Sequence, residues 1–185
     1  MLTLLFLSGS SKLGSTNWRL PRAAAALAAR AFPGRVTSNV LGLDDFDLPT
    51  YQAACGEVPH QLEPVRQAIA RADGIFMSSD EYTGAYSATF KNTVAWLRRA
   101  APDKPVFAGL RVALVSTAAR GAGGLRGHPA LRQLLEELGA EVISQHLELG
   151  TDAGAFDREG NLSPKLEKEL LSGCLAKLAA ERRGG

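Results

Sequence analysis

Apolar and polar positions follow two different spacings along the chain. Short, mostly apolar segments have the length of buried strands, and longer segments between them repeat apolar side chains every three or four residues, as helices do. The predicted strands are Thr3–Leu7, Arg35–Leu43, Gly74–Ser78, Val112–Ser116 and Glu141–Leu147. The predicted helices are Asn17–Phe32, Pro59–Arg71, Ser87–Ala101, Pro129–Leu138 and Ser163–Arg182.

Strands that alternate with helices form a parallel sheet, because each helix carries the chain back across the sheet to the start of the next strand. The sequence therefore predicts an α/β fold, a flavodoxin-like three-layer sandwich around a five-stranded parallel sheet of order 2-1-3-4-5. In that order a ligand lies at the carboxyl ends of strands 1 and 3. No linker interrupts the 185 residues, so we expect a single domain over residues 1–185.

The polar segment after the first strand, Ser8–Asn17, has the composition of an anion-binding loop. It holds five hydroxyl side chains and two glycines, and it opens a helix whose first N–H groups are unpaired. An ordinary capped turn is the alternative, but capping needs fewer hydroxyls. Ser15 stands where a P-loop has lysine, and Ser11 stands at the second glycine of the dinucleotide fingerprint. Mostly neutral donors suit one phosphomonoester, which indicates a mononucleotide such as FMN. The predicted ligands here are Ser10, Lys12, Ser15, Thr16 and Asn17.

Two further loops follow strands 3 and 4 and reach the same edge of the predicted sheet. The first, residues 78–92, carries two tyrosines, a glycine and small polar side chains, which suit the edge and face of an aromatic ring system. Tyr86 could equally pack at a subunit boundary. The second loop, residues 116–124, is glycine-rich and is either a ligand contact or a plain connector. The predicted contacts from both loops are Asp80, Glu81, Tyr82, Thr83, Ser116 and Arg120.

Composition and charge narrow the class of protein. The formal net charge of +2 is too small to indicate a nucleic-acid or membrane partner. Cys55 and Cys174 are far apart in the sequence, and the three histidines form no ligand cluster, so we expect neither a disulfide framework nor a metal site. The apolar start of the chain lacks a basic region and is too short to span a membrane, so we expect a cytoplasmic location.

Several ordered motifs point to one family. Gly9, Ser10, Ser15 and Asn17 match G-S-x-R-x-x-S-x-N, with Lys12 in place of Arg. The second motif, P-E-Y-N-x-S-x-P-G-x-L-K-N-x-x-D-W, is matched at Glu81, Tyr82, Lys91, Asn92 and Trp96. Leu48–Tyr51 fits L-P-x-Y, and residues 104–106 and 121–124 fit the region around strand 4. Together these segments, over roughly residues 3–140, resemble the NADPH-dependent FMN reductases, a flavodoxin-like family that includes azoreductases and quinone or chromate reductases.

The chain departs from the second motif at several positions. Asp80 replaces Pro, Thr83 replaces Asn, Ala85 replaces Ser, Ser87-Ala88 replace Pro-Gly and Ala95 replaces Asp. If Asp80 lies beside the flavin ring, its carboxylate would lower the midpoint potential; the alternative is that it faces solvent or caps the loop. We expect Lys91, Asn92 and Trp96 to organise the loop and its helix rather than to take part in chemistry.

The resemblance implies an NAD(P)H-dependent flavin oxidoreductase with bound FMN. Hydride would pass from NADPH or NADH to FMN and then to a small-molecule electron acceptor: a quinone, a flavin, an azo compound or a metal ion. No side chain is needed as nucleophile or base, so no catalytic residue is assigned. Arg19, Arg22 and Arg120 are open candidates for a 2′-phosphate. The resemblance also implies a homodimer or homotetramer.

A non-catalytic flavin-binding carrier or regulator is the alternative function. An electron-carrier flavodoxin would be strongly acidic, which the net charge of +2 does not support. The altered second motif favours a degenerate site.

Overall fold

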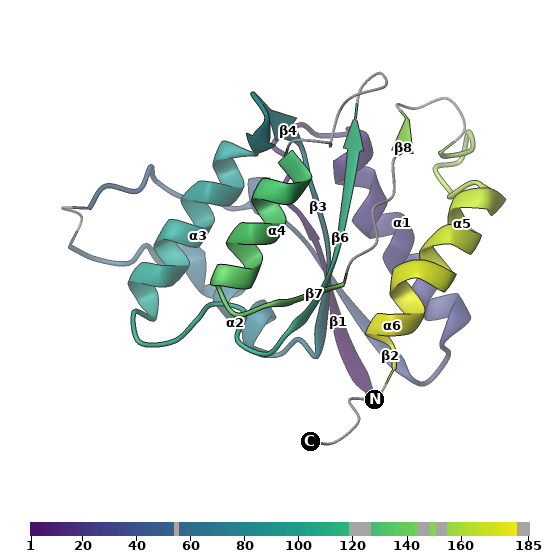
Figure 1. The fold of residues 1–185 in the computed structure, drawn as a ribbon, viewed down its shortest axis with the longest axis horizontal. Coiled ribbons are helices and arrows are strands. Elements are labelled where there is room, and N and C mark those ends of the chain that lie inside the picture. The colour runs from purple at the N-terminus through teal and green to yellow at the C-terminus, as the bar shows by residue number, and fades with distance from the viewer. Residues whose placement is uncertain (54–55, 119–126, 144–148, 151–154, 181–185) are drawn as a thin grey trace.

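Parallel strands form the central sheet of the computed structural model, which describes residues 1–53, 56–118, 127–143, 149–150 and 155–180 (Figure 1). The strands are β1 (Leu2–Ser8), β2 (Val36–Gly42), β3 (Gly74–Ser79), β6 (Arg111–Ala118) and β7 (Glu141–Ile143). Their order is β2-β1-β3-β6-β7, and the short β8 (Leu149–Gly150) also pairs with β6. With β8 left aside, these five parallel strands have the predicted order 2-1-3-4-5. The flavodoxin-like fold is therefore confirmed.

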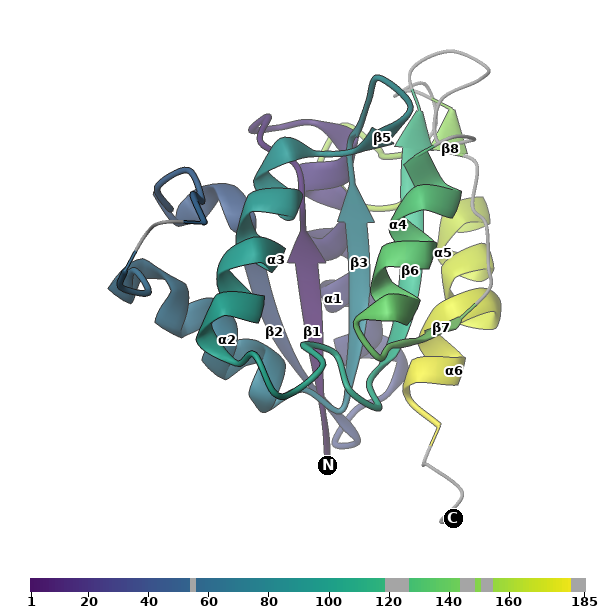
Figure 2. The ribbon, with the colours of Figure 1, turned by 60° about the vertical axis from the view of Figure 1, so that its left-hand side comes forward.

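Helices cover both faces of this sheet (Figures 1 and 2). One face carries α1 (Thr16–Ala31), α5 (Pro164–Leu170) and α6 (Ala176–Leu178). The other carries α2 (Glu63–Ala70), α3 (Ala88–Ala100) and α4 (Gly127–Glu137). Two 3-10 turns, η1 (Leu43–Asp45) and η2 (His60–Leu62), precede α2 in the chain.

The sheet separates two hydrophobic cores. Strand β1 contributes to both, because Leu5 and Leu7 face the α2–α3–α4 side while Leu4 and Phe6 face α1 and the C-terminal helices. All four side chains are fully buried or nearly so. Burial on both faces explains why the strand reads as a continuous apolar run, and each such leucine contributes about 1.5–3 kcal/mol to folding.

Three details of the fold differ from the sequence prediction. The helix expected over Pro59–Arg71 is divided into η2 and α2, with Pro64 in the first turn of α2. The helix expected over Ser163–Arg182 contains a π-helical turn, η3 (Leu171–Leu175), and α6 ends at Leu178. The end of the strand expected over Glu141–Leu147 lies outside the described residues. A small antiparallel hairpin, β4 (Glu81–Tyr82) and β5 (Ala85–Tyr86), was not predicted at all.

Candidate functional site

The predicted anion-binding loop connects β1 to α1. Ser15 is the N-cap of α1, and its Oγ accepts a hydrogen bond from the Trp18 N–H at 3.2 Å. Gly14 precedes it with φ of 73°, a left-handed conformation that glycine adopts without strain. Thr16, the first residue of α1, is buried, whereas Lys12 is exposed. The strand–loop–helix arrangement is as expected from the sequence.

A proline inside α1 ties this helix to the sheet. Pro21 has no N–H, so it cannot bond to the carbonyl four residues earlier, which belongs to Asn17. That carbonyl instead accepts hydrogen bonds from Ser78 Oγ at 2.6 Å and Ser8 Oγ at 3.2 Å. Ser8 is the last residue of β1 and Ser78 the last but one of the adjacent β3, so they anchor the first turn of α1 to the sheet. Neither serine is among the site residues predicted from the sequence, although Pro21, four residues after Asn17, was the available signal.

The side chains of the loop converge on the carboxylate of Asp80. Ser10 Oγ donates to Asp80 Oδ2 at 2.5 Å, and Asn17 Nδ2 donates to Asp80 Oδ1 at 2.7 Å. Ser10 and Asn17 are buried, and Asp80 is half-buried just after β3. Because the single Ser10 proton goes to the carboxylate, the 2.8 Å contact between Ser10 Oγ and Ser15 Oγ has Ser15 as its donor. The structure thus brings together four predicted site residues, and their donors bind an anion of the chain itself.

The hairpin after Asp80 extends this edge of the sheet. Tyr82 pairs with Ala85, and the two residues between them, Thr83 and Gly84, both have positive φ, 50° and 77°. This is the pattern of a type I′ turn. Glu81 fixes the hairpin to the neighbouring helix, because its Oε2 accepts the N–H of Gly127, the first residue of α4, at 3.1 Å. Tyr82 stays 51% exposed, so the hairpin presents an aromatic side chain to the surroundings.

Hydrogen bonds also join the loop, the hairpin and α3. The Gly9 N–H donates to the Ser78 carbonyl at 2.7 Å. The Gly9 carbonyl accepts from Ser87 Oγ at 2.5 Å, and Ser87 is the N-cap of α3. The buried Ser87 therefore fixes the distance between the two loops that the sequence placed at the ligand.

Two other predicted contacts lie on or after β6. Ser116 pairs in register with Ser79 of β3, which places its backbone at the same carboxyl edge. Arg120 lies outside the described residues, as does most of the glycine-rich segment over residues 116–124.

The remaining motif residues have structural roles, as expected for Asn92 and Trp96. Asn92 Oδ1 accepts the Tyr51 N–H at 2.8 Å, and Trp96 Nε1 donates to the Pro49 carbonyl at 2.8 Å. The Tyr51 and Trp96 rings meet edge to face with centroids 5.0 Å apart. The L-P-x-Y segment is therefore held against α3 by the second motif.

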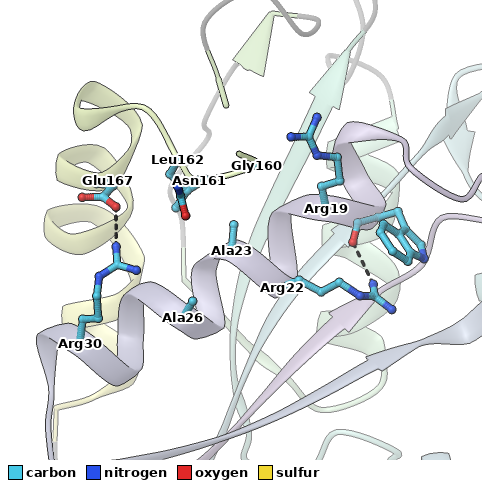
Figure 3. Close-up of a pocket in the computed structure, with 10 residues that line it drawn as sticks. Arg19, Arg22, Ala23, Ala26, Arg30, Gly160, Asn161, Leu162 and Glu167 are labelled. Atoms are coloured by element: carbon cyan, nitrogen blue, oxygen red, sulfur yellow. Dashed lines mark hydrogen bonds and ion pairs between the residues drawn. The ribbon is translucent and has the colours of Figure 1, made fainter. Parts of the chain in front are cut away.

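A hollow of about 300 Å³ lies between α1 and the residues before and within α5 (Figure 3). Its arginines are already engaged. The guanidinium carbon of Arg22 lies 3.7 Å from the centroid of the Trp18 ring, and that of Arg19 lies 4.1 Å from the centroid of the Phe156 ring. Arg30 Nη2 forms an ion pair with Glu167 Oε1 at 2.6 Å. Arg19 and Arg22, the sequence-based candidates for a 2′-phosphate that the structure describes, both line this hollow.

The described residues show neither a membrane-spanning helix nor a metal-binding cluster. None of their helices is long and apolar enough to cross a membrane. No group of three or more His, Cys, Asp or Glu side chains among them is arranged to hold a metal ion.

Comparisons with known proteins agree with the predicted family and the fold. The model of the family described as NADPH-dependent FMN reductase matches residues 2–154. An NADPH:quinone oxidoreductase of Arabidopsis thaliana is 33% identical over 187 residues, covering 97% of this chain and 91% of that protein. A quinone reductase of Escherichia coli strain K12 is 30% identical over 148 residues, covering 78% of this chain and 74% of that protein.

A similar solved structure is the flavoenzyme NAD(P)H:(acceptor) oxidoreductase FerB of Paracoccus denitrificans. It superposes with a TM-score of 0.79 at 21% identity, covering 97% of this chain and 96% of that one. At that identity the likeness supports the fold. The family match over most of the chain goes further: the chain belongs to the NADPH-dependent FMN reductase family and is an NAD(P)H-dependent flavin oxidoreductase that uses FMN.

Proposed function

We propose that the loop between β1 and α1 holds the phosphate of FMN. The observation that carries this proposal is that Ser10 and Asn17 already direct their donors at one anion, the Asp80 carboxylate. The same donors, the Ser15 hydroxyl and the first N–H groups of α1 suit a phosphomonoester. Lys12 and Thr16 complete the proposed phosphate site.

The ring of FMN is proposed to lie at the edge formed by the hairpin. Glu81 holds the hairpin to α4, and Thr83 in its turn is exposed. Tyr82 supplies an exposed aromatic surface. Asp80, Ser116 and Arg120 are proposed to border the same site.

FMN supplies the redox chemistry when bound, accepting a hydride from reduced nicotinamide and passing electrons to the acceptor. The residues of this chain bind and orient it, and none of them needs to form a covalent bond to substrate. Because the two relatives reported above are named for quinones, we propose a quinone as the electron acceptor.

The proposal is tested on purified protein by its visible absorption and by steady-state NADPH oxidation with an added benzoquinone. Flavin bands, quinone-dependent turnover and ping-pong kinetics are expected. A colourless protein that oxidises no NADPH even with added FMN would contradict the proposed function.

Phosphate binding by the loop has its own test. A hydrogen bond to a charged group contributes about 1.5–3 kcal/mol, so Ser15→Ala should weaken FMN binding about tenfold or more and leave riboflavin binding little changed. Ser163→Ala is a matched control, since Ser163 caps α5 as Ser15 caps α1. Equal affinities of the wild type for FMN and riboflavin would refute the phosphate site.

We further propose a homodimer or homotetramer. The exposed Leu13 and Tyr82 are large apolar side chains on the two loops of the site, and a second subunit would cover them. Light scattering that gives only the 19.6 kDa monomer at micromolar concentration would refute this. A cytoplasmic location, where reduced nicotinamide is supplied, is also proposed and is testable by cell fractionation.

A further inference from the structure

The Asp80 carboxylate occupies the donors that the proposed function assigns to the FMN phosphate. We infer that Asp80 is an internal competitor of that phosphate and that it sets how strongly the site distinguishes FMN from riboflavin. This inference rests on the proposed function, since it takes the loop between β1 and α1 to be the phosphate site.

The contacts of Asp80 leave little room for a second anion on the same donors. Its two oxygens take one hydrogen bond each, from Ser10 at 2.5 Å and from Asn17 at 2.7 Å. Ser10 has no second hydroxyl proton to offer a phosphate while it donates to Asp80. For the phosphate to use Ser10, the carboxylate has to leave it.

Charge makes joint occupancy unfavourable as well. A phosphomonoester carries about −1.5 to −2 charges at pH 7, and Asp80 would place another negative charge against it. Among the described residues, no Lys or Arg forms an ion pair with Asp80. Among these residues, the groups that compensate the carboxylate charge are the loop's own donors, Ser10 and Asn17, and these are the groups the phosphate needs.

The contact has opposite consequences in the two states of the protein. Without flavin, Asp80 accepts one hydrogen bond each from the buried Ser10 and Asn17 side chains, which would otherwise lose this acceptor. With FMN, the phosphate satisfies them instead, and Asp80 is displaced into a less favourable position. Asp80 thus stabilises the flavin-free protein and weakens FMN binding. The motif that this chain resembles has proline here, which carries no charge to compete.

The experiment measures flavin binding by fluorescence titration on flavin-free protein, with FMN and riboflavin as the two probes. Asp80→Asn removes the charge and retains one acceptor, and Asp80→Ala removes both. In each variant we expect the FMN dissociation constant to fall at least tenfold, while that of riboflavin changes by less than about threefold, because only FMN brings a phosphate. Thermal unfolding of flavin-free Asp80→Ala should occur roughly 2–4 °C lower, as Ser10 and Asn17 lose their acceptor.

Asp47→Asn is the matched control for net charge. Asp47 is exposed in the segment after β2 and makes no hydrogen bond or ion pair in the described part of the chain. Its substitution should change neither the FMN-to-riboflavin ratio nor the unfolding temperature.

The outcomes separate the competing explanations. Tighter FMN binding together with a less stable flavin-free protein supports the inference, and so does FMN binding by Asp80→Ala where the wild type binds none. Weaker FMN binding in both variants would overturn it, because Asp80 would then only support the loop. An unchanged FMN-to-riboflavin ratio in a protein that binds FMN would overturn it and leave the proposed function standing. If neither the wild type nor the variants bind any flavin, the proposed function and the inference fail together.

Discussion

Thr83 is the described non-glycine residue with a positive φ, 50°, and it forms the turn of the hairpin together with Gly84. A type I′ turn requires positive φ at both central positions and favours Asn-Gly there. Threonine is poorly suited to the first position, since a β-branched side chain crowds the following carbonyl. Asparagine is a polar residue of similar size that adopts positive φ more easily than threonine. Thr83→Asn should therefore stabilise the protein.

The magnitude follows from the cost of the left-handed conformation. That cost is about 1–2 kcal/mol for most residues and is smaller for asparagine, so we expect Thr83→Asn to add about 1 kcal/mol to the free energy of unfolding. Glu81 holds the hairpin to α4 through the Gly127 N–H, so the hairpin should unfold with the rest of the domain. For a chain of this length the gain corresponds to a rise of about 2–4 °C in the unfolding temperature.

Urea denaturation followed by tryptophan fluorescence measures the effect, because Trp96 is buried in the core. Thr83→Val is the matched control: it keeps the branched shape, and the exposed Thr83 hydroxyl makes no hydrogen bond in the described part of the chain. Valine should leave stability within about 0.5 kcal/mol of the wild type. A stabilisation by valine equal to that by asparagine, or none by asparagine, would refute the strain argument.

Three further predictions test the fold. Ser87→Ala should cost about 2 kcal/mol of stability, measured by urea denaturation, because Ser87 both caps α3 and donates to the Gly9 carbonyl; Ser163→Ala, which removes a cap alone, should cost less. Burial raises the pKa of the Cys174 thiol to about 12. In a Cys55→Ser background, a disulfide reagent at pH 8 should therefore react with Cys174 only as fast as the protein unfolds. Rapid reaction of the native protein would contradict this. Burial also raises the pKa of the Asp44 carboxyl, and its Oδ1 has no hydrogen-bond partner among the described residues. Ionisation of Asp44 should therefore destabilise the folded protein as pH rises above 3.8, so Asp44→Asn should be more stable than the wild type at pH 7 and the difference should vanish in acid.

The elements that could be predicted from the sequence are those with a hydrophobic pattern of their own. The five main strands and the helices between them each bury a stripe or a run of apolar residues. That pattern predicted how strands and helices alternate along the chain. The strands β4 and β5 have two residues each, too few to show a period. The π-helical turn around Gly173 also leaves no mark in the apolar spacing, which continues across it.

The site divides in the same way. Gly14 and Ser15 act within one strand–loop–helix unit, so their roles follow from local rules of turns and caps. The partners of Asp80 could not be predicted from local rules, because they are Ser10 and Asn17, which lie 70 and 63 residues away in the sequence. From the sequence, Asp80 was expected beside the flavin ring, in solvent or as a cap of its own loop. Its carboxylate instead accepts hydrogen bonds from the loop between β1 and α1.

Asn17 shows how the two kinds of information combine. Its carbonyl, left without a helical partner by Pro21, is held by Ser8 and Ser78 at the ends of two strands. Its side-chain amide makes a separate hydrogen bond to the Asp80 carboxylate. Because the backbone anchor does not depend on what the amide binds, one anion can replace another at the loop while α1 stays in place. Exchange of Asp80 for a phosphate then requires movement at Asp80 itself, which is why a single substitution there is expected to change FMN affinity without altering the fold.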